Sequence, residues 1–383
     1  MKPIYLDAHA TTPVDPRVLE AMLPFFAEHF GNAASRNHPF GWKATKAVEH
    51  AREQIAALIG ARFRDVVFTS GATESNNLAI KGLASRAPTS RRHIVTITTE
   101  HRAVLDPCRT VARAGFRVTF LGVDREGRID LSQLRDAVTP DTLLVSAMSA
   151  NNEIGVLHPL GEISDIAHAS GALFHCDAAQ SAGLIALNVR DTRIDLASLS
   201  AHKMYGPKGV GALYVARRDP AIDLEPLIDG GGHERGYRSG TLNVPAIVGF
   251  GAAAELCHTS APDETRMRVL RDRLWTALSA VDGIHVNGPV DGRLPNNLNV
   301  LVADVHGETL LKAIASDIAV SSGAACATAS AEPSHVLRAI GLSEEQARAS
   351  IRFGLGRYNT EEEIDAAAAV VIRAVSLLRR RTM

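Results

Sequence analysis

Three residues with chemical potential each follow a separate apolar segment of the sequence. Lys203 follows residues 196–200, Asp177 directly follows residues 172–176, and His101 comes soon after another apolar run. A lysine held away from water loses its proton readily and can then form a Schiff base with an aldehyde. A carboxylate at the end of a buried strand is costly unless it is paired, and a cationic ligand nitrogen is one possible partner.

Small polar residues stand at two further strand ends. Residues 70–74 read Ser-Gly-Ala-Thr-Glu between a predicted strand and a predicted helix. The glycine and the free N–H groups of such a turn suit a phosphate. Asn151 and Asn152 can orient a ligand but are equally good turn formers. Taken singly, each pattern also fits a helix cap, a turn or an ion pair; together they match what pyridoxal 5'-phosphate (PLP) requires.

Cys326 lies in a run of small residues, 321–330. A segment without bulky apolar side chains packs weakly, so we expect an accessible, mobile loop in which a thiol of lowered pKa could act as a nucleophile. A free surface cysteine is the alternative. Cys176 falls within a predicted strand and Cys108 and Cys257 within predicted helices, which favours packing roles for all three.

Arg352 stands in a predicted strand, residues 350–354. An arginine fork can bind the α-carboxylate of an amino acid through two hydrogen bonds. A surface ion pair explains the same residue equally simply, so the assignment depends on its surroundings.

The elements that position these residues follow from the alternation of apolar and helical segments between residues 65 and 215. Continuous apolar strands separated by helices predict an α/β fold with a mostly parallel, helix-covered sheet. After this alternation, the sequence pattern changes to a polar, glycine-bearing stretch at 230–240 and a helical segment at 252–278. We expect a large domain at 15–255 and a smaller α+β domain formed by 1–14 and 256–383. The predicted strands of the large domain are 66–68, 93–97, 142–146, 172–176, 196–200 and 211–215.

The bulk composition is that of a globular protein. The chain has 383 residues, 46% hydrophobic and 22% charged, with a net charge of −1, so no global field points to nucleic acid or an anionic membrane. We see no apolar run that could span a bilayer and no secretory signal at the N-terminus. The four cysteines form no CxxC pair and no metal-ligand spacing, so we expect a cytoplasmic protein without a metal site.

The whole pattern resembles the cysteine desulfurases of the NifS/IscS type, in the class V aminotransferase group of fold-type I PLP enzymes. The resemblance covers nearly the entire chain. The motifs that carry it are Tyr5-Leu6-Asp7, residues 10–13, Phe30-Gly31-Asn32, residues 68–77, Thr99-Glu100-His101, residues 151–155, 200–209, 230–235 and 238–241, and the loop around Cys326.

This resemblance implies a role for each candidate residue. Catalysis falls to Lys203 as the Schiff-base lysine, to His101 in proton transfer and ring stacking, and to Cys326 as the carrier of a persulfide. The implied cofactor contacts are Asp177 to the pyridine nitrogen, Gln180 and Asn152 to the ring hydroxyl, and Ala72, Thr73, Ser200 and His202 to the phosphate. Thr241 is implied as a phosphate contact from a second subunit, hence a homodimer, and Arg352, Asn32 and Asn152 as the substrate site.

The implied reaction converts L-cysteine to L-alanine and passes sulfur to an acceptor protein. That acceptor could serve iron–sulfur clusters, tRNA thiolation or a DNA-sulfur pathway. The chain ends at Met383, short of a C-terminal extension that housekeeping members use to dock the cluster scaffold, which leaves the acceptor open. Ala8 and His9 depart from the family, which often has Asn or Tyr followed by Ala or Ser, and the sequence assigns His9 no role.

Two alternatives share part of this pattern. A PLP transaminase, or a lyase acting on selenocysteine or kynurenine, would need the cofactor residues but not Cys326. A non-catalytic scaffold would need none of them, and the presence of Lys203, Asp177 and Cys326 argues against it.

Overall fold

Short, continuously apolar segments form the central sheet of the protein. The computed structural model describes residues 2–259, 262–322 and 332–382. The sheet has seven strands in the order β2-β8-β7-β6-β5-β3-β4, and β8 alone runs antiparallel to its neighbours. The predicted α/β class with a mostly parallel sheet is thus confirmed. The strands are β2 (Val66–Thr69), β3 (His93–Ile97), β4 (Arg117–Leu121), β5 (Thr142–Ser146), β6 (Leu173–Asp177), β7 (Leu196–Ser200) and β8 (Gly211–Val215).

Strand β4 is missing from the sequence prediction for a physical reason. It lies at the edge of the sheet, and most of its residues are exposed or half-buried. Its sequence therefore lacks the continuous apolar run that marks the inner strands, in which every residue of β3 and β5 is buried.

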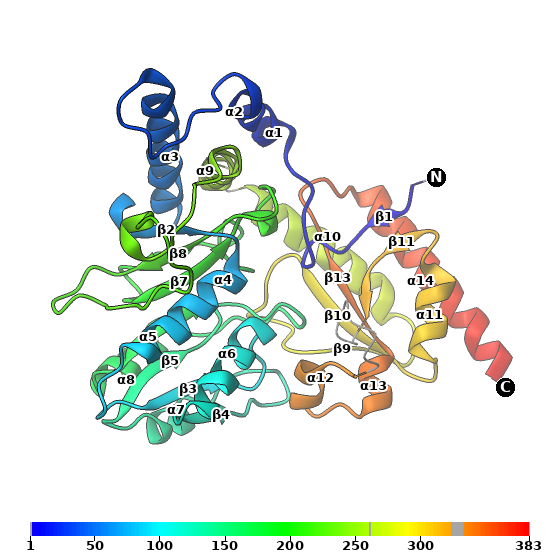
Figure 1. Ribbon diagram of the computed structural model, residues 1–383. Helices are drawn as coiled ribbons and strands as arrows, with labels where there is room; N and C mark the ends of the chain where they lie inside the picture. Colours follow the sequence, from blue (N-terminus) through cyan, green and yellow to red (C-terminus); the bar gives the residue numbers. More distant parts are fainter. Residues whose placement is uncertain (1, 260–261, 323–331, 383) are drawn as a thin grey trace.

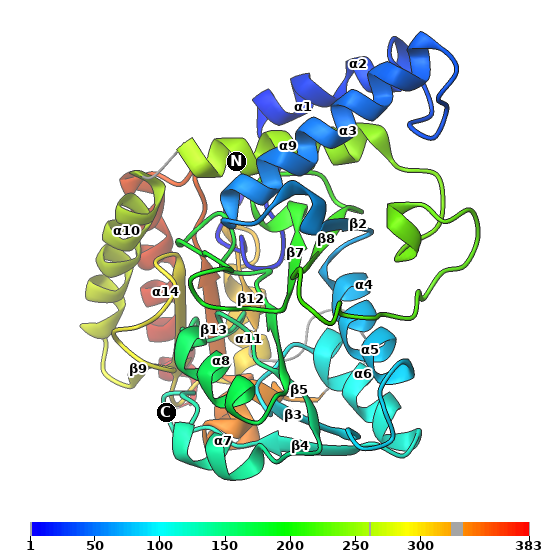
Figure 2. The same ribbon diagram turned by 90° about the vertical axis from the view of Figure 1, so that its left-hand side faces the viewer.

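Helices cover both faces of this sheet (Figures 1 and 2). Successive strand residues point to opposite faces, so Ile94 and Leu144 join one buried cluster while Val95 and Val145 join the other. The first cluster includes residues of the π-helical turn Leu78–Gly82 that follows α4 (Ala72–Asn77), of α5 (Leu83–Ser85) and of α6 (Arg102–Arg113). The second includes residues of α1 (Pro16–Met22), α3 (Pro39–Leu58), α7 (Leu131–Ala137), α8 (Leu160–Ala169) and α9 (Val244–Thr259).

A second region packs around a smaller antiparallel sheet, on the right in Figure 1. Its strand order is β12-β13-β10-β9, and β1 (Ile4–Tyr5) pairs in parallel with β11 (Ile318–Ala319) beside it. The sheet strands are β9 (Ile284–Val286), β10 (Asn297–Val302), β12 (Ser321–Ser322) and β13 (Ser350–Gly354). The helices are α10 (Pro262–Ser279), α11 (Gly307–Ile314), α12 (His335–Ala339), α13 (Glu344–Arg348) and α14 (Glu361–Thr382), while the short α2 (Pro24–Ala27) follows α1.

Two helix starts in this region carry reciprocal caps. The Ser343 hydroxyl accepts from the backbone N–H of Gln346, whose side chain accepts from the Ser343 N–H. Thr360 and Glu363 make the same exchange at the start of α14. Such boxes satisfy N–H groups that a helix leaves unpaired in its first turn.

The buried side chains gather separately in the two regions. The buried cluster of the second region contains residues of α14 and α10 together with Leu6. Helix α9, in contrast, packs on the central sheet. The predicted domain division between residues 255 and 256 falls within α9, and the division itself stays a prediction. Across residues 2–259, 262–322 and 332–382, no helix is both long enough and apolar enough to cross a bilayer.

Candidate active site

A cavity of about 540 Å³ opens where the parallel strands of the central sheet end. Ligands of open α/β sheets bind at this edge because the loops after successive strands converge there. Nine of the predicted site residues line the cavity: Ala72, Thr73, His101, Asn152, Asp177, Gln180, Ser200, His202 and Lys203.

Lys203 reaches the cavity from a single helical turn, Ala201–Lys203, that directly follows β7. Its amine donates to the backbone carbonyls of His9 and Ala10, the latter at 2.9 Å. Burial lowers the pKa of Lys203 to about 8, and the nearby Arg352 charge adds to the effect. A sizeable fraction of this amine is therefore neutral near physiological pH, as a nucleophile or a base requires.

Asp177 lies at the buried end of β6. One carboxylate oxygen accepts from the Asn76 side-chain amide at 2.7 Å and the other from the Ala179 N–H at 3.0 Å. Within the described residues, both hydrogen-bond partners of this carboxylate are neutral. A buried carboxylate that borders a cavity and is balanced only by dipoles suits a cationic ligand nitrogen.

The opposite part of the cavity wall is built for close backbone approach. A Cβ at Gly211 would lie 2.5 Å from the Gly71 Cα, so only glycine fits where β8 passes the start of α4. The N–H groups of Ala72 and Thr73 stand in the first turn of α4, where helix geometry leaves them unpaired. Lys208, which the sequence reasoning did not single out, lines this cavity and supplies a cation.

His202 and His101 are both neutral groups in this wall. Burial, followed by the charges of Lys203 and Lys208, lowers the pKa of His202 to about 4. Enclosure lowers the pKa of His101 as well, an effect that Lys203 strengthens and Asp177 opposes. His101 Nδ1 accepts from the Ala103 N–H at 3.1 Å, which leaves the proton of the neutral ring on Nε2.

Arg352 does not line this cavity. Its guanidinium donates to Asp7 Oδ1 at 2.8 Å and to the backbone carbonyl of Asn152 at 3.0 Å, which places it behind Asn152. Its Nε and the Asn152 Oδ1 are buried and find no hydrogen-bond partner among the residues that the structure describes. Unpaired buried polar groups of this kind are costly unless a ligand or water satisfies them.

Two more predicted residues do not line the cavity. Asn32 is exposed in the loop between α2 and α3, where its side chain accepts from the Ala34 N–H. Thr241 is exposed and lies just before α9. Cys326 lies outside the described residues. Sequence reasoning did not identify Asn76 as a site residue. Its position in the segment 70–77, which leads into and forms α4, could have indicated it.

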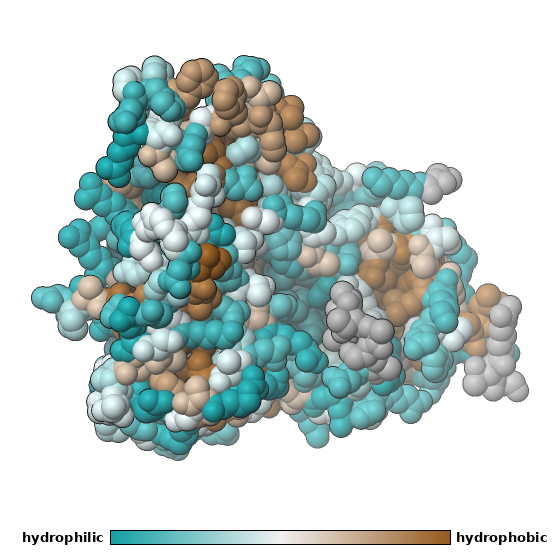
Figure 3. Space-filling model, viewed as in Figure 1, coloured by the Kyte–Doolittle hydropathy of each residue, from teal (hydrophilic) through white to brown (hydrophobic). Residues whose placement is uncertain are grey.

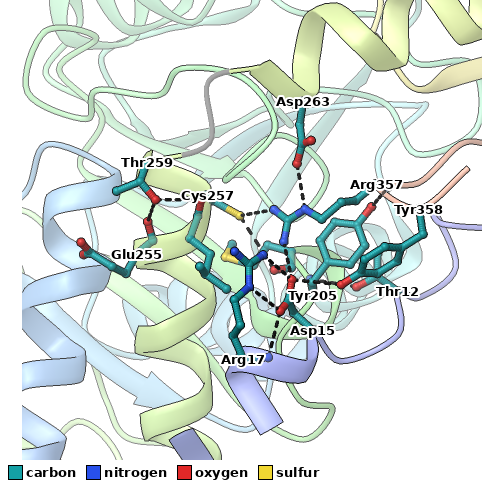
Figure 4. A network of polar contacts seen from close by, with 12 residues as sticks. Thr12, Asp15, Arg17, Tyr205, Glu255, Cys257, Thr259, Asp263, Arg357 and Tyr358 are labelled. Carbon is teal, nitrogen blue, oxygen red and sulfur yellow. Dashed lines mark hydrogen bonds and ion pairs between the residues drawn. The ribbon is translucent and has the colours of Figure 1, made fainter. Parts of the chain in front are cut away.

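A dense polar network supports the Lys203 turn from behind (Figure 4). The Arg357 guanidinium binds Asp15 at 3.0 Å and Asp263 at 2.8 Å, and lies 4.3 Å from the centre of the Tyr205 ring. The Thr12 hydroxyl accepts from the Tyr205 N–H at 2.8 Å and donates to the His202 carbonyl at 3.0 Å. The backbone on both sides of Lys203 is thereby fixed by residues from the second region and the N-terminal segment.

Comparison with known proteins identifies the family of this site. The family model of the class-V aminotransferases matches residues 4–367. A protein of Anaeromyxobacter sp. (strain Fw109-5) called "Cysteine desulfurase IscS" is 59% identical over 379 residues, which cover 98% of this chain and 93% of the relative. The chain is a cysteine desulfurase of the class-V aminotransferase family.

Solved structures agree with this assignment to the NifS/IscS-type desulfurases. A structure titled "NIFS-LIKE PROTEIN" matches 99% of this chain and all of its own length with a TM-score of 0.92 at 38% identity. One titled "SspA in complex with cysteine" covers 94% of this chain and all of its own, with a TM-score of 0.81 and 38% identity. Among residues 2–259, 262–322 and 332–382, the structure shows no group of three or more His, Cys, Asp or Glu residues that could hold a metal ion.

Proposed function

We propose that this desulfurase binds PLP at Lys203, converts L-cysteine to L-alanine, and carries the released sulfur as a persulfide on Cys326. The observation that supports it most is the amine of Lys203, whose pKa burial lowers to about 8, in the same cavity wall as the carboxylate of Asp177. An amine that can lose its proton and a carboxylate without a cationic partner are the two groups that hold the aldehyde and the pyridine nitrogen of this cofactor.

We assign the remaining cavity residues to different parts of the cofactor. We assign the phosphate to Ala72, Thr73, Ser200 and His202, and the ring hydroxyl to Gln180 and Asn152. His101 is assigned to the ring face. When bound, PLP supplies an electron sink that makes the α-proton of the amino acid removable.

The residues of the chain then move protons and sulfur. Lys203, partly neutral near pH 8, takes the α-proton, and the carbonyls of His9 and Ala10 hold its amine whenever it is free. His101 assists in proton transfer. The Cys326 thiolate attacks the substrate sulfur, the carbon–sulfur bond breaks, and its electron pair and a proton end on the carbon skeleton as alanine. An acceptor thiolate later takes the sulfur as in disulfide exchange.

We assign the substrate carboxylate to Arg352, Asn152 and Asn32. The buried, unpartnered Arg352 Nε is an N–H donor and supports an anionic ligand there, although Asp7 already accepts from another nitrogen of the same guanidinium. L-Cysteine is the expected amino acid because the structure titled "SspA in complex with cysteine" is a full-length relative.

We also propose a homodimer in which Thr241 reaches the phosphate of the partner's cofactor. Thr241 is exposed and does not line the cavity of its own chain, in keeping with a role across an interface. Large apolar side chains of the segment from α1 to the start of α3 stand exposed at the top of Figure 3, as a buried interface requires. They are Leu19, Leu23, Phe26, Phe30, Phe40 and Trp42. Sedimentation equilibrium of the wild type and of Phe26→Asp tests this, and a monomeric wild type contradicts it.

The acceptor is proposed to be a cytoplasmic protein with a reactive thiol, serving iron–sulfur clusters or thio-cofactor or tRNA synthesis. Co-purification of the native protein with its partner identifies it.

The central experiment compares the wild type with Cys326→Ser. The variant is expected to keep the visible absorption band of bound PLP and to lose sulfide production from L-cysteine in the presence of a reductant. Alanine is measured with no 2-oxo acid present, which separates desulfuration from transamination. Full turnover by Cys326→Ser, or a wild type that shows no band with PLP, contradicts the proposal.

A further inference from the structure

His9 lies directly behind the cavity wall, in the segment that joins β1 to α1. Its side chain is only 2% exposed. A Cβ at Gly354 would lie 2.8 Å from the His9 ring carbon Cδ2, so the end of β13 packs against the ring. The position of this ring is therefore set by the backbone on which it rests.

Hydrogen bonds join both ends of the Gln180 side-chain amide to His9. The Gln180 Nε2 lies 3.1 Å from the backbone carbonyl of His9, and its Oε1 lies 3.0 Å from the ring Nδ1. A carbonyl can only accept, so the amide NH₂ must face it. The Gln180 oxygen then faces the ring, and Nδ1 must carry a proton to donate to it.

The surroundings keep this ring in the required neutral form. The pKa of His9 is lowered to about 3, first by burial and then by the charges of Arg352 and Lys203, while the contacts with Gln180 and the Asn296 backbone oppose the shift. Only one nitrogen of a neutral ring carries a proton, and the Gln180 oxygen that faces Nδ1 places it there. The Nδ1–H tautomer is thus the one that the fold selects.

We infer that His9 is a positioning residue that locks the amide of Gln180 so that an N–H, and not its oxygen, is presented to the cavity. A flipped amide would set NH₂ against the ring N–H and oxygen against the His9 carbonyl, so both contacts would become repulsive. The inference rests on the proposed function, in which Gln180 faces the hydroxyl oxygen of the PLP ring. An N–H donor at that oxygen stabilises its anionic form and thereby promotes proton loss from the bound cofactor.

The test uses the full-length protein loaded with PLP and no substrate. His9→Leu fills the space but removes the donor, His9→Asn restores a donor on a short side chain, and Gln180→Ala removes the amide. Two quantities are measured: the midpoint of the pH-dependent change in the visible band, and the dissociation constant of PLP. His9→Leu is expected to raise the midpoint and to weaken PLP binding about 3- to 10-fold, as the loss of one hydrogen bond implies.

Two further variants and a control test whether the effect depends on the contact between His9 and Gln180. His9→Asn is expected to restore the wild-type midpoint, and the double variant His9→Leu/Gln180→Ala to shift no further than Gln180→Ala alone, because both act through one contact. His93 provides the matched control, since its ring is buried and bonded to Thr142 and Thr119 at 2.9 Å at the far end of β3. His93→Asn is expected to reduce thermal stability without moving the midpoint.

Two results overturn the inference while the proposed function stands. One is a folded His9→Leu protein with the wild-type midpoint and PLP affinity, and the other is a shift that simply adds to that of Gln180→Ala. A wild type that forms no visible band with PLP is a separate result, because it removes the proposed function and the inference with it.

Discussion

The two sides of the turn that carries Lys203 differ in how completely their polar groups are paired. On the cavity side, the side-chain oxygens of Asn76 and Asn152 are buried without partners in the described chain, and Asp177 has only neutral partners there. On the far side, Asp15 and Arg357 each bind several groups. A ligand site is thus marked by polar groups that the chain leaves unsatisfied, and its support by groups that the chain satisfies fully.

Removing the amine should have the largest effect. Lys203→Ala is expected to lose the covalently held cofactor and to lower cysteine turnover at least about 10³-fold, because nucleophile and base are the same group. Borohydride reduction followed by mass spectrometry of the tryptic peptides measures the attachment. PLP fixed on Lys208, which also lines the cavity, would contradict the assignment.

Disrupting the polar network around Asp15 and Arg357 should destabilise the folded protein. Asp15 is nearly fully buried, and hydrogen bonds from Arg17 and Tyr358 hold the pKa of its carboxyl well below the usual range. Asp15→Asn is expected to destabilise the protein by about 3 kcal/mol, because it leaves the buried Arg357 charge without one of its carboxylates.

Arg17→Ala is the matched control, since Arg17 binds the same carboxylate but is 62% exposed. Its effect should remain below about 1 kcal/mol. Calorimetry of both variants without cofactor measures the difference, and equal midpoints for the two variants would show that the network is not the support described here.

The lowered pKa of Lys203 predicts how cofactor capture depends on pH. The neutral form of the amine reacts with PLP, so the rate of capture should rise about tenfold from pH 7 to pH 9 and level off above the pKa of about 8. An unperturbed lysine, with a pKa of 10.5, would still be gaining rate at pH 10. Stopped-flow absorption after mixing apoprotein with PLP distinguishes the two profiles.

The smallest effect is expected at Cys257, beside the network. Its sulfur lies 3.8 Å from the Met204 carbonyl and 3.9 Å from an Arg357 nitrogen, and burial raises the pKa of the thiol, so it is a packing group. Cys257→Ala should lower the free energy of unfolding by about 1 kcal/mol and leave turnover unchanged. Loss of persulfide formation in this variant would move the sulfur chemistry away from Cys326.

The sequence was informative where local pattern and family motifs coincide. The apolar strands and the polar residues that follow them predict the cavity, because parallel strands end at one edge and place Lys203, Asp177 and His101 together there. The sequence did not indicate contacts that depend on packing between distant parts of the chain. No local signal in the sequence indicates that His9 meets Gln180, that Arg357 lies against Tyr205, or that Arg352 pairs with Asp7.

The N-terminal strand β1 has a consequence for the order of events in the cell. It pairs with β11, and the Asp7 backbone bridges to Gly354, so the first residues made are held by some of the last. The carbonyls of His9 and Ala10, which accept from the amine of Lys203, lie in the segment that this pairing holds. If PLP binds at Lys203 as proposed, the complete cofactor site is therefore expected only after residue 354 has been synthesised, and a chain truncated before β13 should not hold the cofactor.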